Sequence, residues 1–214
     1  MKIAFRHLFL ALAWMHLGVA GAGGARADEH ATIRNVKQAP PAESQAALSG
    51  PFDLKGRPID PLAHVEAKGV VLIFVATDCP IANRYAPEVE RLYETYGGRK
   101  IAFWLVYADP RDDAAKIAKH FDEYRYKVTA IRDPQHRLVK RCGVNKTPES
   151  VLLGPGGKQL YRGRIDDRFT GYGKSRIAPT RRELEDAIDS VLEGRPVRIA
   201  STEVVGCFIP DADR

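Results

Sequence analysis

Three cysteines are the side chains in this sequence best suited to covalent chemistry. Cys79, Cys142 and Cys207 are the full set in a chain of 214 residues. Three are too few for a disulfide framework, and an odd number leaves at least one thiol free or paired outside the chain. Thiolates attack disulfides and peroxides. We therefore expect thiol–disulfide or thiol–peroxide chemistry at one of these positions.

Cys79 has the sequence context of a reactive thiol. It follows the apolar, β-branched run at 69–75, and Pro80 after it suits the first turn of a helix because it has no N–H to lose. The dipole and free N–H groups of a helix N-terminus favour a thiolate, whereas the charge of Asp78 disfavours it. A buried, inert cysteine is the less favoured alternative, because Cys79 ends a strand.

Strands and helices alternate around this cysteine. Apolar runs at 69–75 and 101–106 predict strands buried on both faces, and shorter strands are predicted at 52–54, 128–131, 149–153 and 159–164. Periodic apolar residues predict helices between 80 and 96, 112 and 124, 134 and 141, and 180 and 192. This order indicates an α/β fold with a mixed central sheet flanked by helices, extended by a C-terminal helix and tail.

Local signals set the expected faces and ends of these helices. Tyr85, Val89, Leu92 and Tyr96 share one face of the first helix, and Gly97 ends it. The second helix is expected to bury Ile117, Ala118, Phe121 and Tyr124. Thr180 and Glu183 have the spacing of a capping box at the start of the last helix.

The N-terminal segment has the composition of a secretory signal. Lys2 and Arg6 precede an apolar run at 8–20, and the small residues of Ala25-Arg26-Ala27 follow. We assign residues 1–27 to a signal peptide, 28–50 to a flexible linker, 51–194 to the folded domain and 195–214 to a C-terminal tail. The mature chain is then periplasmic or secreted and has no integral membrane segment.

The charge balance gives no reason to invoke nucleic acid. The formal net charge is +6, and three of these charges lie in residues 1–27, which contain no acid. A mature chain carrying +3 has an ordinary, mildly basic surface.

These features together resemble a known family. The stretch from Val70 to Tyr96 resembles the strand, active site and helix of thioredoxin-like redoxins of the TlpA/ResA type, related to the AhpC/TSA superfamily. Cys79-Pro80 matches the nucleophile and its proline, Pro87 matches the proline that kinks the helix, and Thr147-Pro148 matches the cis-proline loop facing the nucleophile. The resemblance covers residues 51–167.

The resemblance implies a function and a site. It implies an exported thiol–disulfide oxidoreductase with Cys79 as nucleophile, and a substrate surface formed by Thr147, Pro148, Pro80 and Thr77. The expected partners are a disulfide-containing protein or a peroxide, and an external thiol that donates electrons. No cofactor and no metal are expected.

One departure from the family directs attention to the tail. Ala82 stands where dithiol redoxins have their second cysteine. The chain resembles a bacterial group with a single active-site cysteine and a Gly-Cys-x-Ile tail, which Gly206-Cys207-Phe208-Ile209 fits. We therefore hypothesise a reversible disulfide between Cys79 and Cys207, and expect Cys142 to be a small buried hydrophobe.

Three alternatives remain open. A peroxiredoxin-like thiol peroxidase shares this fold, but the threonine expected three residues before its cysteine is replaced by Ala76. Arg162, Arg164 and Arg168 are candidates for the arginine that such an enzyme needs. A copper-handling protein would need a second loop cysteine and a suitably placed histidine. A non-catalytic thioredoxin-like binding module would need no reactive thiol.

Overall fold

The structure, a computed structural model, describes residues 50–63 and 66–212. The predicted signal peptide at 1–27 and all but the last residue of the predicted linker at 28–50 lie outside the described residues. Within the described residues, no helix is long and apolar enough to cross a membrane.

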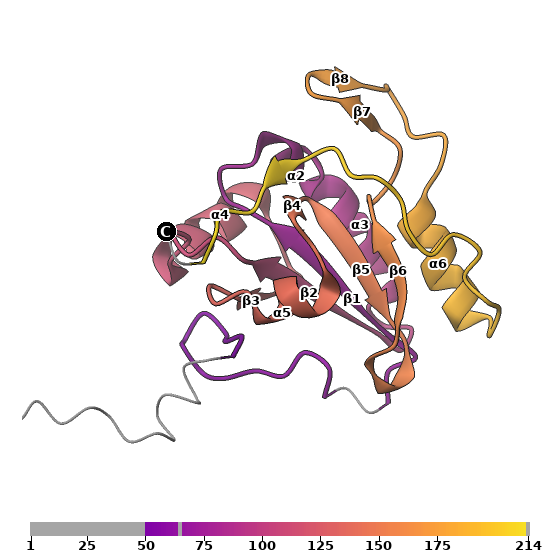
Figure 1. Ribbon diagram of the computed structural model, residues 1–214, viewed down its shortest axis with the longest axis horizontal. Coiled ribbons are helices and arrows are strands. Elements are labelled where there is room, and N and C mark those ends of the chain that lie inside the picture. Colours follow the sequence, from indigo (N-terminus) through magenta and orange to yellow (C-terminus); the bar gives the residue numbers. More distant parts are fainter. Residues whose placement is uncertain (1–49, 64–65, 213–214) are drawn as a thin grey trace, which may run out of the picture. The chain divides into compact units, whose positions relative to one another are not determined.

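A five-stranded sheet is the centre of the fold (Figure 1). Its strand order is β3-β2-β1-β5-β6, with β1 (Gly69–Val75) in the middle. The strands β2 (Ile101–Tyr107) and β3 (Thr129–Arg132) run parallel to β1. The hairpin of β5 (Glu149–Leu153) and β6 (Gln159–Gly163) is antiparallel to it, with the turn Pro155–Gly157 between its strands. The predicted α/β class and mixed sheet are confirmed.

Helices cover both faces of this sheet. Val71, Ile73 and Val75 of β1 belong to one core cluster with α3 (Ala86–Tyr96), α4 (Ala114–Tyr124) and α6 (Glu183–Leu192). The alternate residues Val70, Leu72 and Phe74 belong to a second cluster with α5 (Arg137–Cys142). All seven residues of β1 are buried, as its continuous apolar run predicts.

The helix after Cys79 is broken into two. The short helix α2 (Pro80–Arg84) ends at Tyr85, and α3 begins at Ala86 with Pro87 in its first turn. A proline in the middle of one continuous helix would remove a hydrogen bond and clash with the preceding turn, so the break falls directly before it. The predicted inward face of Val89, Leu92 and Tyr96 is confirmed.

The C-terminal tail forms a strand, but not where the sequence suggests. Val204 and Val205 have the β-branched side chains of an edge strand but are not part of one, whereas β9 (Cys207–Phe208) pairs antiparallel with β4 (Lys146–Thr147). A second small sheet joins β7 (Phe169–Gly171) to β8 (Lys174–Ser175). Both small sheets and α2 lie at the same end of the central sheet (Figure 1).

Three local predictions are wrong. Ala118 is exposed and His120 is buried in its place, because α4 turns the Ile117–His120 side of the helix to the core. The capping box does not form, since the Thr180 hydroxyl bonds to Asp167 and Glu183 pairs with Arg164. Instead of a strand at 52–54, Phe52 makes isolated bridges to Pro58 and Arg132.

Candidate active site

Cys79 lies where β1 ends and α2 begins. It is the N-cap residue of α2, its N–H donates to the Ala76 carbonyl at 3.2 Å, and only 1% of its surface is exposed. Because α2 has only five residues, its N-terminus favours a thiolate less than the single long helix predicted from sequence would. Pro80 is exposed beside it, where it can contact a substrate.

Thr77 anchors the loop that presents Cys79. Its backbone N–H and its hydroxyl donate to the two carboxylate oxygens of Asp112, at 3.1 and 2.7 Å. Asp112 is buried and also pairs with Lys116 at 2.7 Å. The Thr77 side chain therefore holds this loop in place, and its expected role in contacting substrate stays a prediction.

A buried histidine holds the same loop from α4. The Asn83 side-chain NH2 donates to the Thr77 carbonyl at 3.1 Å. The Asn83 side-chain oxygen therefore points to His120 Nε2, at 2.9 Å. Nε2 must then carry the proton, and Nδ1 accepts from the Tyr107 hydroxyl at 2.8 Å. Burial lowers the pKa of His120, so the ring is neutral at pH 7.

Thr147 and Pro148 face Cys79. Their peptide bond is cis, and the Thr147 carbonyl accepts from the Cys79 thiol at 3.1 Å. Thr147 is buried, and its hydroxyl has no hydrogen-bond partner among the described residues. Of the substrate-surface residues expected from sequence, Thr147 lies directly against the cysteine.

Cys207 is the second thiol of the site. Its strand β9 pairs with β4 so that Cys207 lies opposite Thr147, and its Sγ is 2.7 Å from Sγ of Cys79. This separation is longer than the ~2.05 Å of a disulfide bond. Both cysteines are free thiols here. The thiol next to Cys79 therefore comes from a residue 128 positions away, and not from position 82, which is an alanine.

The protons of the two thiols can be assigned from their contacts. Cys79 has one proton and two close neighbours, so both contacts are satisfied when Cys79 donates to Thr147 and Cys207 donates to Cys79. Burial, the hydrogen bond to Cys79 and the nearby charges of Cys79 and Asp78 raise the pKa of Cys207 to about 12. Cys207 therefore keeps its proton at neutral pH.

Hydrogen bonds fix the tail along its length. Thr202 is bonded to β6 through its backbone N–H, which donates to the Arg162 carbonyl, and through its hydroxyl, which contacts the Tyr161 hydroxyl at 2.9 Å. Further along, the Ile209 N–H donates to the Asn145 carbonyl at 3.0 Å. The Tyr172 hydroxyl of the β7–β8 turn donates to the Gly206 carbonyl at 2.5 Å. The tail is thus a docked segment.

Gly206 allows this close approach. A Cβ at this position would lie 2.3 Å from the Thr147 carbonyl oxygen and 2.8 Å from its carbon. Both atoms belong to the backbone and cannot rotate away. The glycine before Cys207 is therefore required for the two sulfur atoms to meet.

Cys142 lies apart from the pair. It is 2% exposed and belongs to the core cluster on the other face of the sheet from Cys79. Burial raises its pKa to about 11. The expectation of a small buried hydrophobe is confirmed.

Sequence reasoning missed the residues that support the pair. Asp112, Asn83 and His120 are polar side chains turned inward from helices, and Tyr172 reaches the tail from a turn. One signal was present for His120, because it follows Ile117 by three positions on the buried side of α4. The others depend on contacts between distant segments and leave no local pattern.

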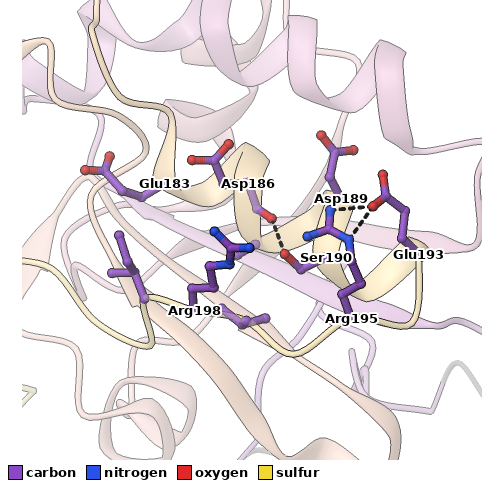
Figure 2. A pocket seen from close by; sticks show the side chains of 10 residues that line it. Glu183, Asp186, Asp189, Ser190, Glu193, Arg195 and Arg198 are labelled. Carbon is purple, nitrogen blue, oxygen red and sulfur yellow. Dashed lines mark hydrogen bonds and ion pairs between the residues drawn. The ribbon is translucent and has the colours of Figure 1, made fainter.

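A separate cavity lies between α6 and residues 195–199 (Figure 2). Its lining includes Asp186, Asp189 and Glu193, with Arg195 paired to Glu193 and Arg198 beside them. It contains no cysteine.

Among the described residues, no group of three or more histidine, cysteine or acidic side chains is arranged to hold a metal ion.

Comparisons with known proteins identify the family of the chain. The model of the AhpC/TSA family matches residues 37–162. The thiol-disulfide oxidoreductase ResA of Halalkalibacterium halodurans is 27% identical over 129 residues, which are 59% of this chain and 72% of ResA.

Solved structures extend the similarity to the fold. An uncharacterized conserved protein from Geobacillus kaustophilus has a TM-score of 0.65 at 24% identity, covering 76% of this chain and 89% of its own. A hypothetical protein from Sinorhizobium meliloti has a TM-score of 0.64 at 20% identity, covering 76% and 92%. The thioredoxin-like fold and the resemblance to redoxins are confirmed, while membership of a single-cysteine group stays a prediction.

Proposed function

The chain belongs to the AhpC/TSA family, and we propose that within it the protein is an exported thiol–disulfide oxidoreductase whose redox centre is the pair Cys79 and Cys207. The observation that carries this proposal is the 2.7 Å separation of the two sulfur atoms beside the Thr147 carbonyl. The similarity to ResA, an oxidoreductase by name, supports the same reaction type.

The two cysteines have different roles in the proposed cycle. Cys79 loses its proton and attacks one sulfur of a substrate disulfide, so that a mixed disulfide forms and the other substrate sulfur leaves as a thiol. Cys207 then attacks Cys79 Sγ, which releases the second substrate thiol and closes the Cys79–Cys207 disulfide. Two electrons pass from the protein to the substrate, and an external thiol returns them. The raised pKa of Cys207 favours Cys79 as the nucleophile of the first step, and Cys207 gives its proton to the departing substrate sulfur in the second.

Exposure decides where each partner enters. Cys79 is 1% exposed under the tail, whereas Cys207 is only partly buried. An incoming thiol therefore attacks the Cys207 sulfur of the oxidised protein, and Cys79 leaves as a thiol. A second donor thiol then attacks the donor sulfur of this mixed disulfide, which releases Cys207 as a thiol and the donor as its disulfide. An incoming disulfide reaches Cys79 only when β9 moves from β4. The short pairing of two residues on each strand suits such a movement.

Peroxide reduction is less well supported. Such an enzyme needs an arginine at the cysteine to polarise the peroxide, and three were candidates. Arg162 instead donates to the Gly143 carbonyl at 2.7 Å, Arg164 pairs with Glu183, and Arg168 lies 3.6 Å from Asp166. Among the described residues, Cys79 has hydrogen bonds to Thr147 and Cys207 and no arginine contact.

Copper handling is also less well supported. The pair supplies two soft sulfur ligands, but a third ligand would have to come from elsewhere. His120 is bonded to Tyr107 and Asn83, and His136 to the Ala108 carbonyl at 2.9 Å. The other mature histidines, His30 and His64, lie outside the described residues.

The location follows from the sequence. The N-terminal segment has the pattern of a signal peptide, and a disulfide that cycles against an external thiol suits an oxidising compartment. We propose that the mature protein acts in the periplasm or is secreted. Mass spectrometry of the protein from a periplasmic or secreted fraction should find an N-terminus near Asp28; the full-length N-terminus in that fraction would contradict the proposal.

Thiol mapping tests the redox centre directly. The wild type and Cys142→Ser should each lose two thiols on mild diamide treatment, yield a cross-linked Cys79–Cys207 peptide, and recover fully with dithiothreitol. Cys207→Ser should accumulate mixed disulfides on Cys79 and turn over a peptide disulfide slowly. Absence of the cross-linked peptide, together with unchanged turnover by Cys207→Ser, would refute the pair. Unchanged turnover by Cys79→Ser would indicate a non-catalytic binding module.

A further inference from the structure

A basic groove lies next to the redox centre. The last turn of α2, the end of α4 and the segment at and after β8 form its walls. Its lining includes four arginines, Arg84, Arg125, Arg168 and Arg176, and a single acid, Glu123. The end of β8 and the two residues after it form one wall, and the hairpin β7–β8 lies at the same end of the sheet as α2 and β9 (Figure 1).

The positive charge of this groove is only partly compensated. Arg84 and Arg125 are exposed, and neither forms an ion pair within the described part of the chain. The Arg84 guanidinium lies 5.3 Å from the centre of the Phe169 ring, which orients it without neutralising it. Arg168 has only long ion pairs, at 3.6 Å to Asp166 and 3.8 Å to Glu88. Arg176 is the one that pairs more closely, with Asp167 at 3.4 Å.

Arg125 has a left-handed backbone conformation, which glycine usually adopts at the end of a helix. It is the C-cap of α4 with φ 56° and ψ 39°. Left-handed backbone costs a side chain with a Cβ roughly 1 kcal/mol, which is why glycine predominates at this position. Arginine at this position therefore lowers local stability while it places a positive charge at the groove. Backbone strain of this kind is concentrated at functional sites.

The groove also offers apolar contacts. Ile177 is fully exposed at its edge, and Tyr124 and Pro87 line it. Arg84 is five residues after Cys79, a rise of about 8 Å along a helix. A ligand in the groove is therefore within a few residues' reach of the cysteines.

We propose that this groove docks an acidic segment, with an apolar side chain among its acids, of the protein that exchanges disulfides with the Cys79–Cys207 pair. The proposal rests on the redox function proposed above. Carboxylates match the guanidinium groups, and the apolar side chain matches Ile177 and Tyr124. A concave groove suits an extended peptide better than the surface of an anionic membrane.

The hairpin connects the groove to the tail. Ser175, Arg176 and Ile177 line the groove, while Tyr172 at the hairpin turn donates to the Gly206 carbonyl beside Cys207. A segment bound in the groove thus contacts the same hairpin that holds the tail in place. Docking and access to the cysteine pair share one structural element.

The test compares three peptides of equal length against the reduced Cys142→Ser protein. One peptide is acidic, one neutral and one basic, and each carries one cysteine in a mixed disulfide with 2-thiopyridine, a neutral leaving group. The Cys79 sulfur bonds to the peptide sulfur and thiopyridine leaves, after which Cys207 displaces the peptide thiol. The measured quantity is the second-order rate constant of thiopyridine release, with and without salt.

The matched variants separate the groove from general charge effects. R84E/R125E reverses two charges in the groove, and R137E/K158E reverses two exposed, unpaired charges elsewhere. At low salt we expect the acidic peptide to react about tenfold faster than the neutral one, and salt to remove the difference. R84E/R125E should abolish this preference and R137E/K158E should keep it, with the thermal unfolding of both unchanged.

Different failures point to different conclusions. Equal rates for acidic and neutral peptides, or equal losses in both double variants, would overturn the docking proposal and leave the redox centre intact. No Cys79-dependent release from any peptide would overturn the redox function. A fluorescent acidic peptide without cysteine should still bind the groove in that case, and absence of binding would overturn docking too. Binding to phosphatidylglycerol vesicles without peptide binding would assign the groove to a membrane and contradict the proposal.

Discussion

Replacing Gly206 by alanine tests whether the docked tail makes the redox centre. The new Cβ would lie 2.3 Å from the Thr147 oxygen, and real Cβ atoms essentially never come within 3.0 Å of another atom. The tail must therefore move away by about 0.7 Å or more, because the clashing atoms are backbone atoms of Thr147, a buried residue of β4. Cys207 is the next residue and must move with it.

The cost can be worked out from the hydrogen bonds nearest the clash. The Tyr172 bond to Gly206 at 2.5 Å and the Ile209 bond to Asn145 at 3.0 Å would both be stretched or lost. At about 1 kcal/mol for each net hydrogen bond, docking weakens by about 2 kcal/mol, or roughly 30-fold. The tail is docked while both thiols are free, but in the reduced variant it can leave β4 and relieve the clash, whereas the disulfide holds Cys207 in place. Disulfide formation is therefore weakened by at most this amount.

The assay is the equilibrium of the Cys79–Cys207 disulfide with glutathione. Gly206→Ala should lower the effective concentration of the pair by up to roughly 30-fold. Gly98→Ala, where an added Cβ meets nothing within 4 Å, should leave it unchanged. Thermal unfolding of the reduced variants should stay close to the wild type, since the tail contributes only partly buried side chains, such as Val205 and Ile209, to the two core clusters. An effective concentration within twofold of the wild type would show that tail docking does not create the pair.

Three further predictions concern charges and thiols around this centre. Asp112→Asn should lower the free energy of unfolding in urea by about 1–3 kcal/mol, because Thr77 and Lys116 lose a buried carboxylate; Asp113→Asn, which keeps an N-cap, should lower it far less. Burial raises the pKa of Asp167, but hydrogen bonds from Thr180 and Arg181 and the charge of Arg176 outweigh it and hold the pKa at about 2. The stability it contributes is present above pH ~4 and lost as the pH falls towards 2, so Asp167→Asn should be less stable at pH 7 and equal to the wild type near pH 2 in chemical unfolding. Iodoacetamide should alkylate Cys207 of the reduced wild type slowly at pH 8 and faster in Cys79→Ser, which removes the hydrogen bond and charge of Cys79; equal rates would contradict the assigned proton.

The central strand and the strand–helix junction after it could be predicted from the sequence alone, because their signals are local. The run at 69–75 is apolar at every position, which only a strand buried on both faces explains, and β1 is that strand. Cys79-Pro80 after it and Pro87 further on mark the strand–helix junction and the break between α2 and α3. These signals span a few residues each, because hydrogen bonding and side-chain direction within an element repeat at short, fixed intervals.

Tertiary structure alone decided how the site is assembled. The strand β9 has two residues, too few to show a period, and its partner β4 is about 60 positions away. The Thr77–Asp112 and Asn83–His120 bonds join residues 35 and 37 positions apart, and the four arginines of the groove come from three separate segments. The sequence indicated Cys207 as a partner for Cys79, since the position of the second motif cysteine is taken by Ala82. It did not reveal that the tail is docked, because docking depends on Gly206 fitting against the Thr147 backbone, a contact that exists only once both chain segments are folded.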